Sequence, residues 1–313
     1  MPVSDPPWHR ALAEEHPEVL VVYQAALKLT AQCIREAADD QLPDLAGCRA
    51  MATRMVDGMA ASPMPFMQLA LRPTSDVPFY VVHPVNVAIL LLEMAQGWPG
   101  LHVSQEDLAL LGLLHDLGMA KLQHIITQPR RLTADERAEM QHHVALTHEM
   151  LSQMQDLAPE ILAAATQDHE RLDGTGYPHQ HRRGGMHQLG SLLAVADIFE
   201  AMTHERPYQA ARAPYLALRE LLSAGAEVLE PAFLKLLVYR IGVYPVGSWV
   251  ELTSREIARV VATRPGTPLR PLVEVMGSTD RRTEGRRRVL DLSVVAGVSI
   301  TRWLDEAALQ RYL

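Results

Sequence analysis

The chain has 313 residues and a formal net charge of −8. This length is enough to bury a substantial core and indicates one large or two modest domains. Non-specific binding to nucleic acid draws on clustered Lys and Arg, so the negative charge argues against a nucleic-acid polymer as a partner. Aromatic residues make up only 5% of the chain while Ala, Leu and Met are frequent, which favours a mainly α fold.

Neither a membrane span nor a signal peptide is predicted. The longest apolar stretches, such as residues 87–92, are far too short to cross a bilayer, and residues 1–18 lack the apolar centre of a signal peptide. We therefore expect a soluble, cytoplasmic protein. Cys33 and Cys48 form no zinc-like or disulfide pattern, which indicates ordinary thiols in a reducing compartment.

Residues 1–75 are predicted to form an N-terminal helical segment. One or two amphipathic helices cover residues 19–38, a break follows at residues 42–44, and a further helix covers residues 45–59. Pro63 and Pro65 then interrupt that helix. We expect this segment to be a short sensor or a dimerisation arm, and the second alternative implies a homodimer.

Residues 76–240 are predicted to be the functional core, built of helices separated by short loops. Residues 241–313 are predicted to be a C-terminal extension with short strands and a final helix. Residues 247–252 and 257–262 have the alternating, β-branched character of strands, whereas residues 265–271 are typical of a loop. The arginines at 281, 282 and 286–288 are interpreted as a solvated turn between two strands.

The pair His115-Asp116 ends a helix with leucines at helical spacing, and Gly118 allows the backbone to turn just after it. Polar side chains in such an apolar setting are unfavourable unless something pairs with them. Similar residues recur in other apolar segments: His83, His143, Asp168, His169 and Asp197. A helical bundle in which each helix contributes one imidazole or carboxylate is a known way to build a dinuclear metal site.

The types of these residues restrict the metal. Imidazole and carboxylate without thiolate suit iron, manganese, nickel or zinc, whereas calcium or magnesium prefers oxygen alone. The residue types do not choose among these four metals. A single His on an apolar helix is usually a core residue with a hydrogen-bond partner, so the ordered set carries the prediction.

The segment Asp168-His-Glu-Arg-Leu-Asp-Gly-Thr-Gly-Tyr-Pro178 resembles the HHExxDGxGYP signature of HD-GYP domains. These are bacterial metal-dependent phosphodiesterases of the HD superfamily that act on cyclic di-GMP. Further landmarks agree in order and spacing over residues 50–304: His83, His115-Asp-Leu-Gly118, His143, Asp197-Ile-Phe-Glu-Ala-Met-Thr203, Arg206-Pro-Tyr208 and Tyr244-Pro-Val-Gly-Ser-Trp-Val-Glu-Leu252. The resemblance implies an HD-superfamily helical bundle with a small C-terminal β element.

The resemblance also assigns the ligands. One metal takes His83, His115, Asp116 and Asp197, and its neighbour shares Asp116 and adds His143, Asp168 and His169. Two cations about 3.5–4 Å apart would polarise the phosphoryl oxygens and deprotonate a bridging water. The implied reaction is attack of that hydroxide on cyclic di-GMP, or a related cyclic dinucleotide, giving pGpG, or GMP where a second hydrolysis follows.

Candidate substrate-binding residues follow from the same motifs. Tyr177 and Asp173 belong to the glycine-rich loop, where the ring of Tyr177 is suited to meet a guanine or close the cleft. Arg206 offers bidentate geometry for a phosphate, and Tyr208 follows it. The alternatives are a plain turn for the loop and a surface salt bridge for Arg206.

Several positions depart from the family pattern. Asp168 replaces the first histidine of the doublet, Phe79 replaces the glutamate of a third metal site, and Gln209 replaces a second cation after Arg206. Met119 stands at the HDxGK lysine, so the nearest cation, Lys121, becomes the candidate catalytic cation beside Asp116. Turnover is therefore expected to be slow.

These departures leave a second hypothesis open. The chain would then be a partly degenerate HD-GYP protein that retains metal or nucleotide. It would act as a sensor or interaction module, for example with a protein that carries a diguanylate cyclase domain.

Overall fold

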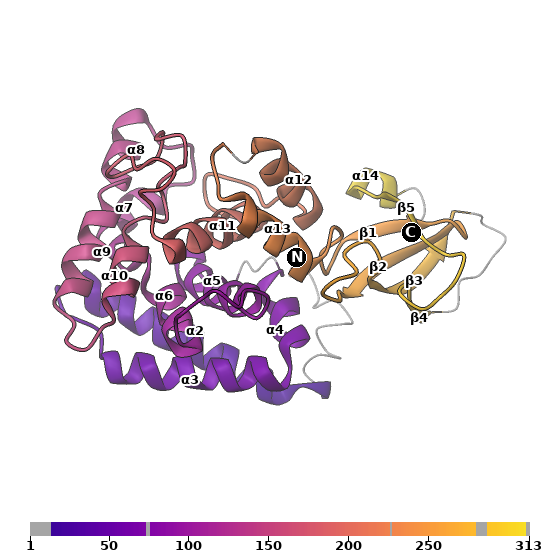
Figure 1. Cartoon of the computed structure of the whole chain (residues 1–313), viewed down its shortest axis with the longest axis horizontal. Helices are drawn as coiled ribbons and strands as arrows, with labels where there is room; N and C mark the ends of the chain where they lie inside the picture. Colours follow the sequence, from indigo (N-terminus) through magenta and orange to yellow (C-terminus); the bar gives the residue numbers. More distant parts are fainter. Residues whose placement is uncertain (1–13, 73–75, 226, 280–286, 311–313) are drawn as a thin grey trace.

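The structure is a computed structural model and describes residues 14–72, 76–225, 227–279 and 287–310. A helical body carries a small antiparallel sheet on one side (Figure 1). The helices are α2 (Pro17–Ala38), α3 (Leu45–Ala61), α4 (Pro63–Ala70), α5 (Phe79–Ala95), α6 (Gln105–Leu114), the 3₁₀ helix η1 (Leu117–Leu122), α7 (Gln123–Ile126), α8 (Ala134–Met140), α9 (His143–Ser152), α10 (Pro159–Ala165), α11 (Gln188–Thr203), α12 (Pro214–Ala224), α13 (Pro231–Ile241) and α14 (Glu306–Leu309). The predicted mainly α fold with a small C-terminal β element is confirmed.

The N-terminal helices end and begin at the predicted breaks. The Asp44 carboxylate accepts hydrogen bonds from the backbone amides of Ala46 and Gly47, and so caps the start of α3. Pro63 starts α4 directly after α3 ends at Ala61. Helices α2, α3 and α4 do not form a separate body. Their buried side chains belong to the same hydrophobic cluster as those of α5, α6, α11 and α13.

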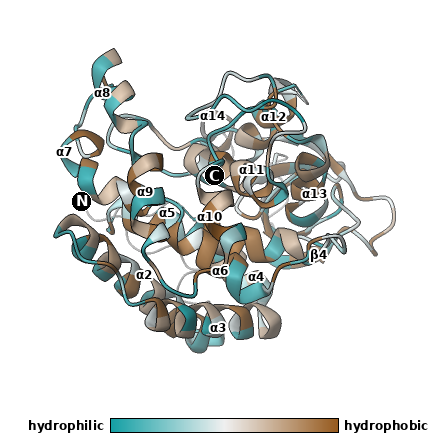
Figure 2. Cartoon of the chain, turned by 60° about the vertical axis from the view of Figure 1, so that its left-hand side comes forward, coloured by the Kyte–Doolittle hydropathy of each residue, from teal (hydrophilic) through white to brown (hydrophobic). Residues whose placement is uncertain are grey.

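Helices α5 and α6 form the centre of this cluster. Side chains from Val81 to Ala95 of α5 are buried on every side of the helix, which explains its apolar sequence. The two helices approach closely at Gly112, where an added Cβ would lie 2.3 Å from the Cα of Ala88. In Figure 2, α5, α6 and α10 are largely brown, whereas α2 and α3 alternate between brown and teal, as expected for helices with one exposed face.

The sheet has the strand order β4-β3-β2-β1-β5 and is antiparallel throughout. Its strands are β1 (Trp249–Leu252), β2 (Glu256–Ala262), β3 (Leu272–Ser278), β4 (Arg288–Asp291) and β5 (Ile300–Trp303). The sheet has a hydrophobic cluster of its own, distinct from that of the helical body. The rings of Tyr215, Tyr244 and Trp303 stack at centroid distances of 5.4 and 5.3 Å and join α12 to β5.

The predicted strands at 247–252 and 257–262 correspond to β1 and β2, and residues 265–271 lie between β2 and β3. Most of the arginine-rich segment, residues 280–286, lies outside the described residues. Cys33 of α2 and Cys48 of α3 are free, buried thiols whose sulfur atoms lie 3.7 Å apart.

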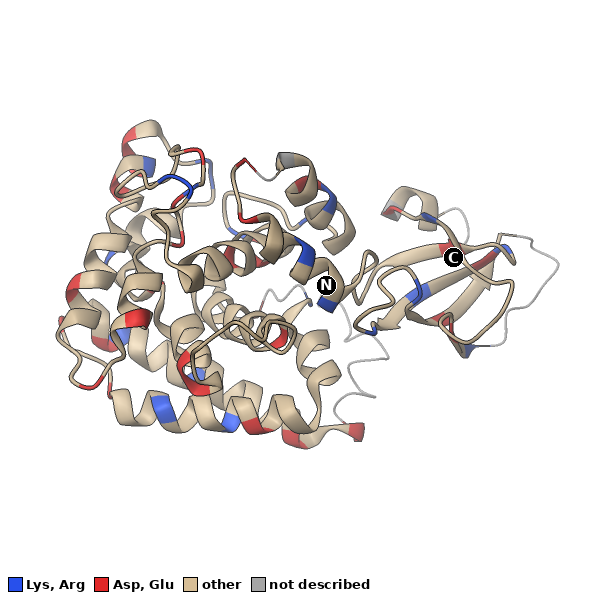
Figure 3. Ribbon diagram, in the orientation of Figure 1, with Lys and Arg blue, Asp and Glu red and all other residues tan. Residues whose placement is uncertain are grey.

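Charged residues are dispersed over the surface of the helical body and the sheet. In the ribbon of Figure 3, blue and red segments alternate, and neither forms a continuous face in this view. Within the described ranges, none of the helices combines the length and apolar character that a bilayer crossing requires.

Candidate metal centre

The seven side chains that the sequence predicts as metal ligands converge at one place. His83 projects from α5, His115 caps the end of α6, and Asp197 lies in the middle of α11. Asp116 precedes η1, and His143 is the first residue of α9. Asp168 and His169 follow the end of α10. All are buried except Asp116 and His169, which are partly buried.

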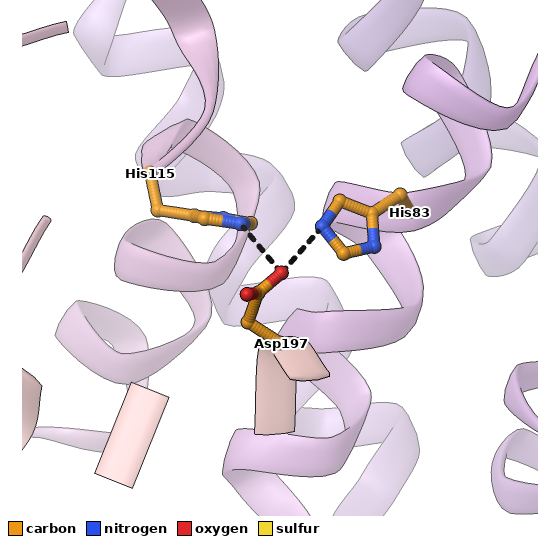
Figure 4. A group of neighbouring side chains, drawn as sticks. All are labelled: His83, His115 and Asp197. Atoms are coloured by element: carbon orange, nitrogen blue, oxygen red, sulfur yellow. Dashed lines mark ion pairs between the residues drawn. The ribbon is translucent and has the colours of Figure 1, made fainter. Parts of the chain in front are cut away.

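His83, His115 and Asp197 form the first group of candidate ligands (Figure 4). Each offers one donor atom, and these atoms lie within 4.8 Å of one another. The Nε2 atom of His83 is 3.0 Å from Oδ1 of Asp197, and Nε2 of His115 is 4.0 Å from the same oxygen. The three helices α5, α6 and α11 therefore present their donors to a common point.

Asp116, His143 and His169 form the second group. The Nε2 atoms of the two histidines lie 2.9 Å apart, and that of His143 is 3.4 Å from Oδ1 of Asp116. The other oxygen of Asp116, Oδ2, is 3.6 Å from Nε2 of His83 and 3.8 Å from Nε2 of His115. Asp116 thus directs one carboxylate oxygen toward each group.

Asp168 belongs to two further groups of donors, one with His115 and Asp116 and one with His169 and Asp197. Its Oδ1 accepts a hydrogen bond from the backbone amide of His169. Its Oδ2 is buried and has no hydrogen-bond partner. The carboxylate that replaces the first imidazole of the family doublet therefore still presents one free donor to the centre.

The residues fit a metal site. His83 Nε2, His115 Nε2, Asp116 Oδ1 and Asp168 Oδ2 are buried, and none has a hydrogen-bond partner of acceptable geometry. Unsatisfied buried polar atoms are rare because each carries a desolvation penalty. Here they occur together and face one another. Divalent cations bound between them would satisfy all four.

The surroundings shift the pKa values of three of the predicted ligands. Burial would raise the pKa of Asp116, but the imidazoles of His115, His143 and His83 outweigh burial and lower it. Burial lowers the pKa of His169 to about 3, so this imidazole is neutral and its nitrogen is available as a ligand. Burial and the carboxylates of Asp197 and Asp116 raise the pKa of Asp168. Bound cations relieve such crowding of carboxylates.

Three of the predicted histidine ligands, His83, His115 and His143, use the Nδ1 atom for a second contact. His115 Nδ1 lies 2.9 Å from the carbonyl oxygen of Gly112, and His143 Nδ1 lies 2.7 Å from that of Met140. His83 Nδ1 contacts the buried carboxylate of Glu200. These contacts fix each ring with Nε2 toward the centre, as is usual for metal-binding histidines.

A buried network behind His83 was missed by the sequence analysis. Asn86 donates to Glu200 Oε1 over 2.9 Å, and the hydroxyl of Tyr23 donates to Asn86 Oδ1 over 2.8 Å. Glu200 also pairs with His204. The available signal was a polar Asn within the apolar α5 and a Glu three residues after Asp197 on α11. The sequence did not show that α2, α5 and α11 bring these side chains into contact.

Gly118 allows η1 to approach α9. An added Cβ would lie 2.2 Å from the carbonyl oxygen of His143, and the Gly118 amide donates to Thr147 Oγ1 over 2.9 Å. This close approach places Asp116, two residues earlier, beside His143. The glycine of the HD motif therefore helps to bring the two groups of ligands together.

The glycine-rich loop packs against the second group. The ring of Tyr177 stacks on His169 with a centroid distance of 4.7 Å, and the Tyr177-Pro178 peptide bond is cis. The buried carboxylate of Glu170 accepts from the backbone amides of His179 and His181, which holds the loop in place. Asp173 is exposed, and its carboxylate accepts from the amide and hydroxyl of Thr175 within the turn.

Arg206 and Tyr208 lie together beside Phe79. The guanidinium of Arg206 lies 5.3 Å from the centroid of the Phe79 ring, and Arg206 Nη1 is 3.5 Å from the Tyr208 hydroxyl. Phe79, which replaces the third-site glutamate of the family, therefore supports Arg206 by a cation–π contact. The sequence analysis treated this position only as a lost ligand.

Lys121 is not brought into the ligand groups. Its ammonium donates to the carbonyl oxygen of Ala38 and to the carboxylate of Asp40, at the end of α2. Met119 instead lines a narrow gap that reaches Asp116. The apolar side chain thus occupies the place beside the centre, and the nearest lysine is engaged elsewhere.

With this geometry established, comparison with known proteins defines the class. Residues 12–232 match the model of the HD domain family, and residues 249–311 match that of a KOW domain associated with the HD domain. The first match covers most of the chain, which therefore belongs to the HD domain family. Its motifs and relatives identify it more closely as an HD-GYP domain protein, in agreement with the sequence analysis.

Curated relatives extend the comparison. The chain is 29% identical to cyclic di-GMP phosphodiesterase PA4108 of Pseudomonas aeruginosa, over 93% of this chain and 70% of that one. It is 31% identical to the cyclic di-GMP phosphodiesterase response regulator RpfG of Xanthomonas campestris, over 42% of this chain but only 36% of that one. The structure of Bd1817, an HD-GYP-type protein from Bdellovibrio bacteriovorus, matches with a TM-score of 0.56 over 70% of each chain at 14% identity, which supports the fold.

Proposed function

We propose that the chain is a metal-dependent phosphodiesterase that hydrolyses cyclic di-GMP, or a related cyclic dinucleotide, to pGpG, or to GMP where a second hydrolysis follows. The observation that carries this proposal is Asp116, whose two carboxylate oxygens face two groups of buried donors. The relatives support the substrate class, because they include cyclic di-GMP phosphodiesterases and a 3′3′-cGAMP-specific phosphodiesterase of Vibrio cholerae.

Two divalent metal ions are proposed, iron or manganese ahead of nickel or zinc. His83, His115 and Asp197 would hold one ion, His143 and His169 the other, with Asp116 shared between them and Asp168 adding an oxygen. The chemistry that the ions supply when bound is neutralisation of phosphoryl charge and activation of a water nucleophile. Glu200 orients the His83 ring for this purpose through its contact with Nδ1.

The substrate-side residues bind and orient the nucleotide in this proposal. Arg206, held over Phe79, is positioned to pair with a phosphate oxygen. Tyr177 covers His169 and excludes water from that side of the centre. Tyr208 keeps the guanidinium in place through its hydroxyl. Asp173 shapes the glycine-rich loop by its hydrogen bonds to Thr175.

A second candidate function is favoured by Met119 and Lys121. Among the described residues no lysine is found beside Asp116, since Lys121 bonds to the end of α2. An HD-GYP protein without this cation would retain metals and nucleotide but turn over little substrate. It would then act as a sensor or as an interaction module, with a diguanylate cyclase protein or with a second copy of the chain as partner.

One experiment separates the two functions. The protein is purified anaerobically, its metal content is measured, and cyclic di-GMP hydrolysis is followed by chromatography of the products. About two metals per chain together with formation of pGpG support the phosphodiesterase. Nucleotide binding without product, by fully metal-loaded protein, favours the sensor. No bound metal, or three metals per chain, contradicts the proposed centre.

A further inference from the structure

A hollow of about 510 Å³ lies between α2 and the start of α5. Leu27, Ala31 and Ile34 of α2 form one wall, and Tyr80 with its neighbours forms the other. The residues of α2 that line the hollow recur at helical spacing, so they form one stripe along the helix: Gln24, Leu27, Lys28, Ala31, Ile34 and Arg35. The hollow therefore combines apolar walls with two cations.

Both cations of this stripe are available to a ligand. Lys28 and Arg35 are exposed, and neither side chain forms an ion pair or hydrogen bond with another described residue. Elsewhere on α2, Tyr23, Ala26 and Cys33 turn into the hydrophobic cluster. In a chain of net charge −8, two free cations two turns apart on the same face of α2 provide local attraction for a small anion beside the apolar hollow.

The hollow adjoins the candidate metal centre. A narrow gap lined by Asp116 and Met119 shares Ile34 and Tyr80 with it. A second hollow of about 430 Å³, which contains Arg206, shares Tyr80 and the two residues Val77 and Pro78 with it. Tyr80 thus borders all three spaces. The two hollows have volumes of about 510 and 430 Å³, within the range of about 300–1,000 Å³ typical of small-ligand sites.

We propose that α2 forms one half of the nucleotide cleft, an inference that rests on the proposed function and deepens it. A cyclic dinucleotide carries two phosphates on opposite sides of its ring. The phosphate that is cleaved lies at the candidate metal centre, to which Asp116 belongs. The other half of the nucleotide occupies the α2 hollow, where Lys28 and Arg35 pair with the second phosphate and Tyr80 contacts the base.

Several observations favour this occupant. Among the described residues that line the other hollow, Arg206 is the one cation, and Glu205 lies beside it. The second phosphate is therefore left to Lys28 and Arg35. Purine bases pack well on aromatic rings and apolar walls, which the first hollow offers. In this arrangement α2 contributes to the binding of a cyclic dinucleotide, which has a second phosphate, but not to the binding of a small phosphodiester, which has only one.

The test compares two substrates. Kinetics are measured for cyclic di-GMP and for bis(p-nitrophenyl) phosphate, a small diester that needs only the metal centre. In Lys28→Glu and Arg35→Glu, we expect the KM for cyclic di-GMP to rise at least about tenfold, because a charge-assisted contact becomes repulsive. The ratio of kcat/KM for cyclic di-GMP to that for the small diester should fall by a similar factor.

Two kinds of control variant are used. One kind keeps the positive charge at positions 28 and 35, and the other reverses a charge at a residue outside the α2 hollow. Lys28→Arg and Arg35→Lys should retain most of the affinity for cyclic di-GMP. Arg54→Glu makes the same change of charge at an exposed residue of α3 that lines a different hollow, and should leave the KM unchanged. A KM for cyclic di-GMP within about twofold of the unmodified protein in both charge reversals would overturn the inference.

Failure of the proposed function is distinguishable. If the metal-loaded protein hydrolyses neither substrate, calorimetric titration with cyclic di-GMP replaces kinetics. A loss of affinity of at least about tenfold in Lys28→Glu and Arg35→Glu then still supports the inference, whereas unchanged affinity overturns it. If light scattering shows that these variants change the oligomeric state and not nucleotide affinity, the α2 face is a contact between copies, and the inference is wrong.

Discussion

Asp116 is the residue at which the two groups of ligands meet. Replacement by Ala removes the carboxylate that faces both groups, so Asp116→Ala should lose both metals and all turnover, whereas His143→Ala should retain about one metal. Elemental analysis of the purified proteins measures this difference. His142→Ala changes an exposed neighbour and should keep the full metal content. Wild-type metal content in Asp116→Ala would contradict the site assignment.

Met119 and Lys121 decide how fast the centre can work. Met119 lines the gap beside Asp116, so an ammonium introduced there can stabilise charge that builds on the phosphoryl group. Met119→Lys should raise kcat by about tenfold or more, with little change in nucleotide affinity. Steady-state kinetics and calorimetry measure the two quantities.

Lys121→Met is the matched variant. The ammonium of Lys121 pairs with the exposed Asp40 in the unmodified protein. Its removal should leave kcat nearly unchanged and lower the free energy of unfolding by at most about 1 kcal/mol. An unchanged rate in metal-loaded Met119→Lys, combined with a large loss in Lys121→Met, would restore Lys121 as the catalytic cation.

At the scale of elements, α2 is linked to the metal centre through α5 and α11. The hydrogen bonds from Tyr23 to Asn86 and from Asn86 to Glu200 end at the Nδ1 side of His83. Glu200→Gln removes the charge that orients this ring and should weaken metal affinity by about 10–100-fold. Tyr23→Phe leaves Asn86 Oδ1 without its donor and should lower stability by about 1–3 kcal/mol.

Competition with a metal chelator measures the affinity, and denaturant unfolding measures the stability. Glu36→Gln serves as the control for a lost carboxylate, because Glu36 of α2 is partly buried and bonds to Gln32 outside this network. A Glu200→Gln protein with unchanged affinity would show that the His83 ring is held by packing alone.

At the scale of the whole molecule, one hydrophobic cluster joins the helices that carry the ligands, so metal binding should stabilise the helical body as a unit. Metal present at about 100 times its dissociation constant contributes about 2.7 kcal/mol. Removal with a chelator should therefore lower Tm by roughly 5–10 °C. Calorimetry with and without the chelator tests this, and Asp116→Ala should show no such difference. If the chelator lowered the Tm of the unmodified protein and of Asp116→Ala equally, its effect would not come from this metal centre.

The sequence determined the fold class and pointed to the ligands because both depend on local patterns. Apolar residues at helical spacing predicted the buried helices, and prolines marked the breaks around α4. His83, His115 and Asp197 were conspicuous because polar side chains are rare in such helices. The sheet was only partly predicted, since β1 and β2 showed alternation whereas the short β4 and β5 lie at its edges.

Tertiary structure alone decided which distant side chains act together. Lys121 is near Met119 in sequence but bonds to the end of α2, while Phe79 and Arg206 meet across 126 intervening residues. Tyr23 reaches Glu200 only through the packing of three helices. Such contacts depend on how helices cross and rotate against one another, which the spacing of residues along a single helix does not specify.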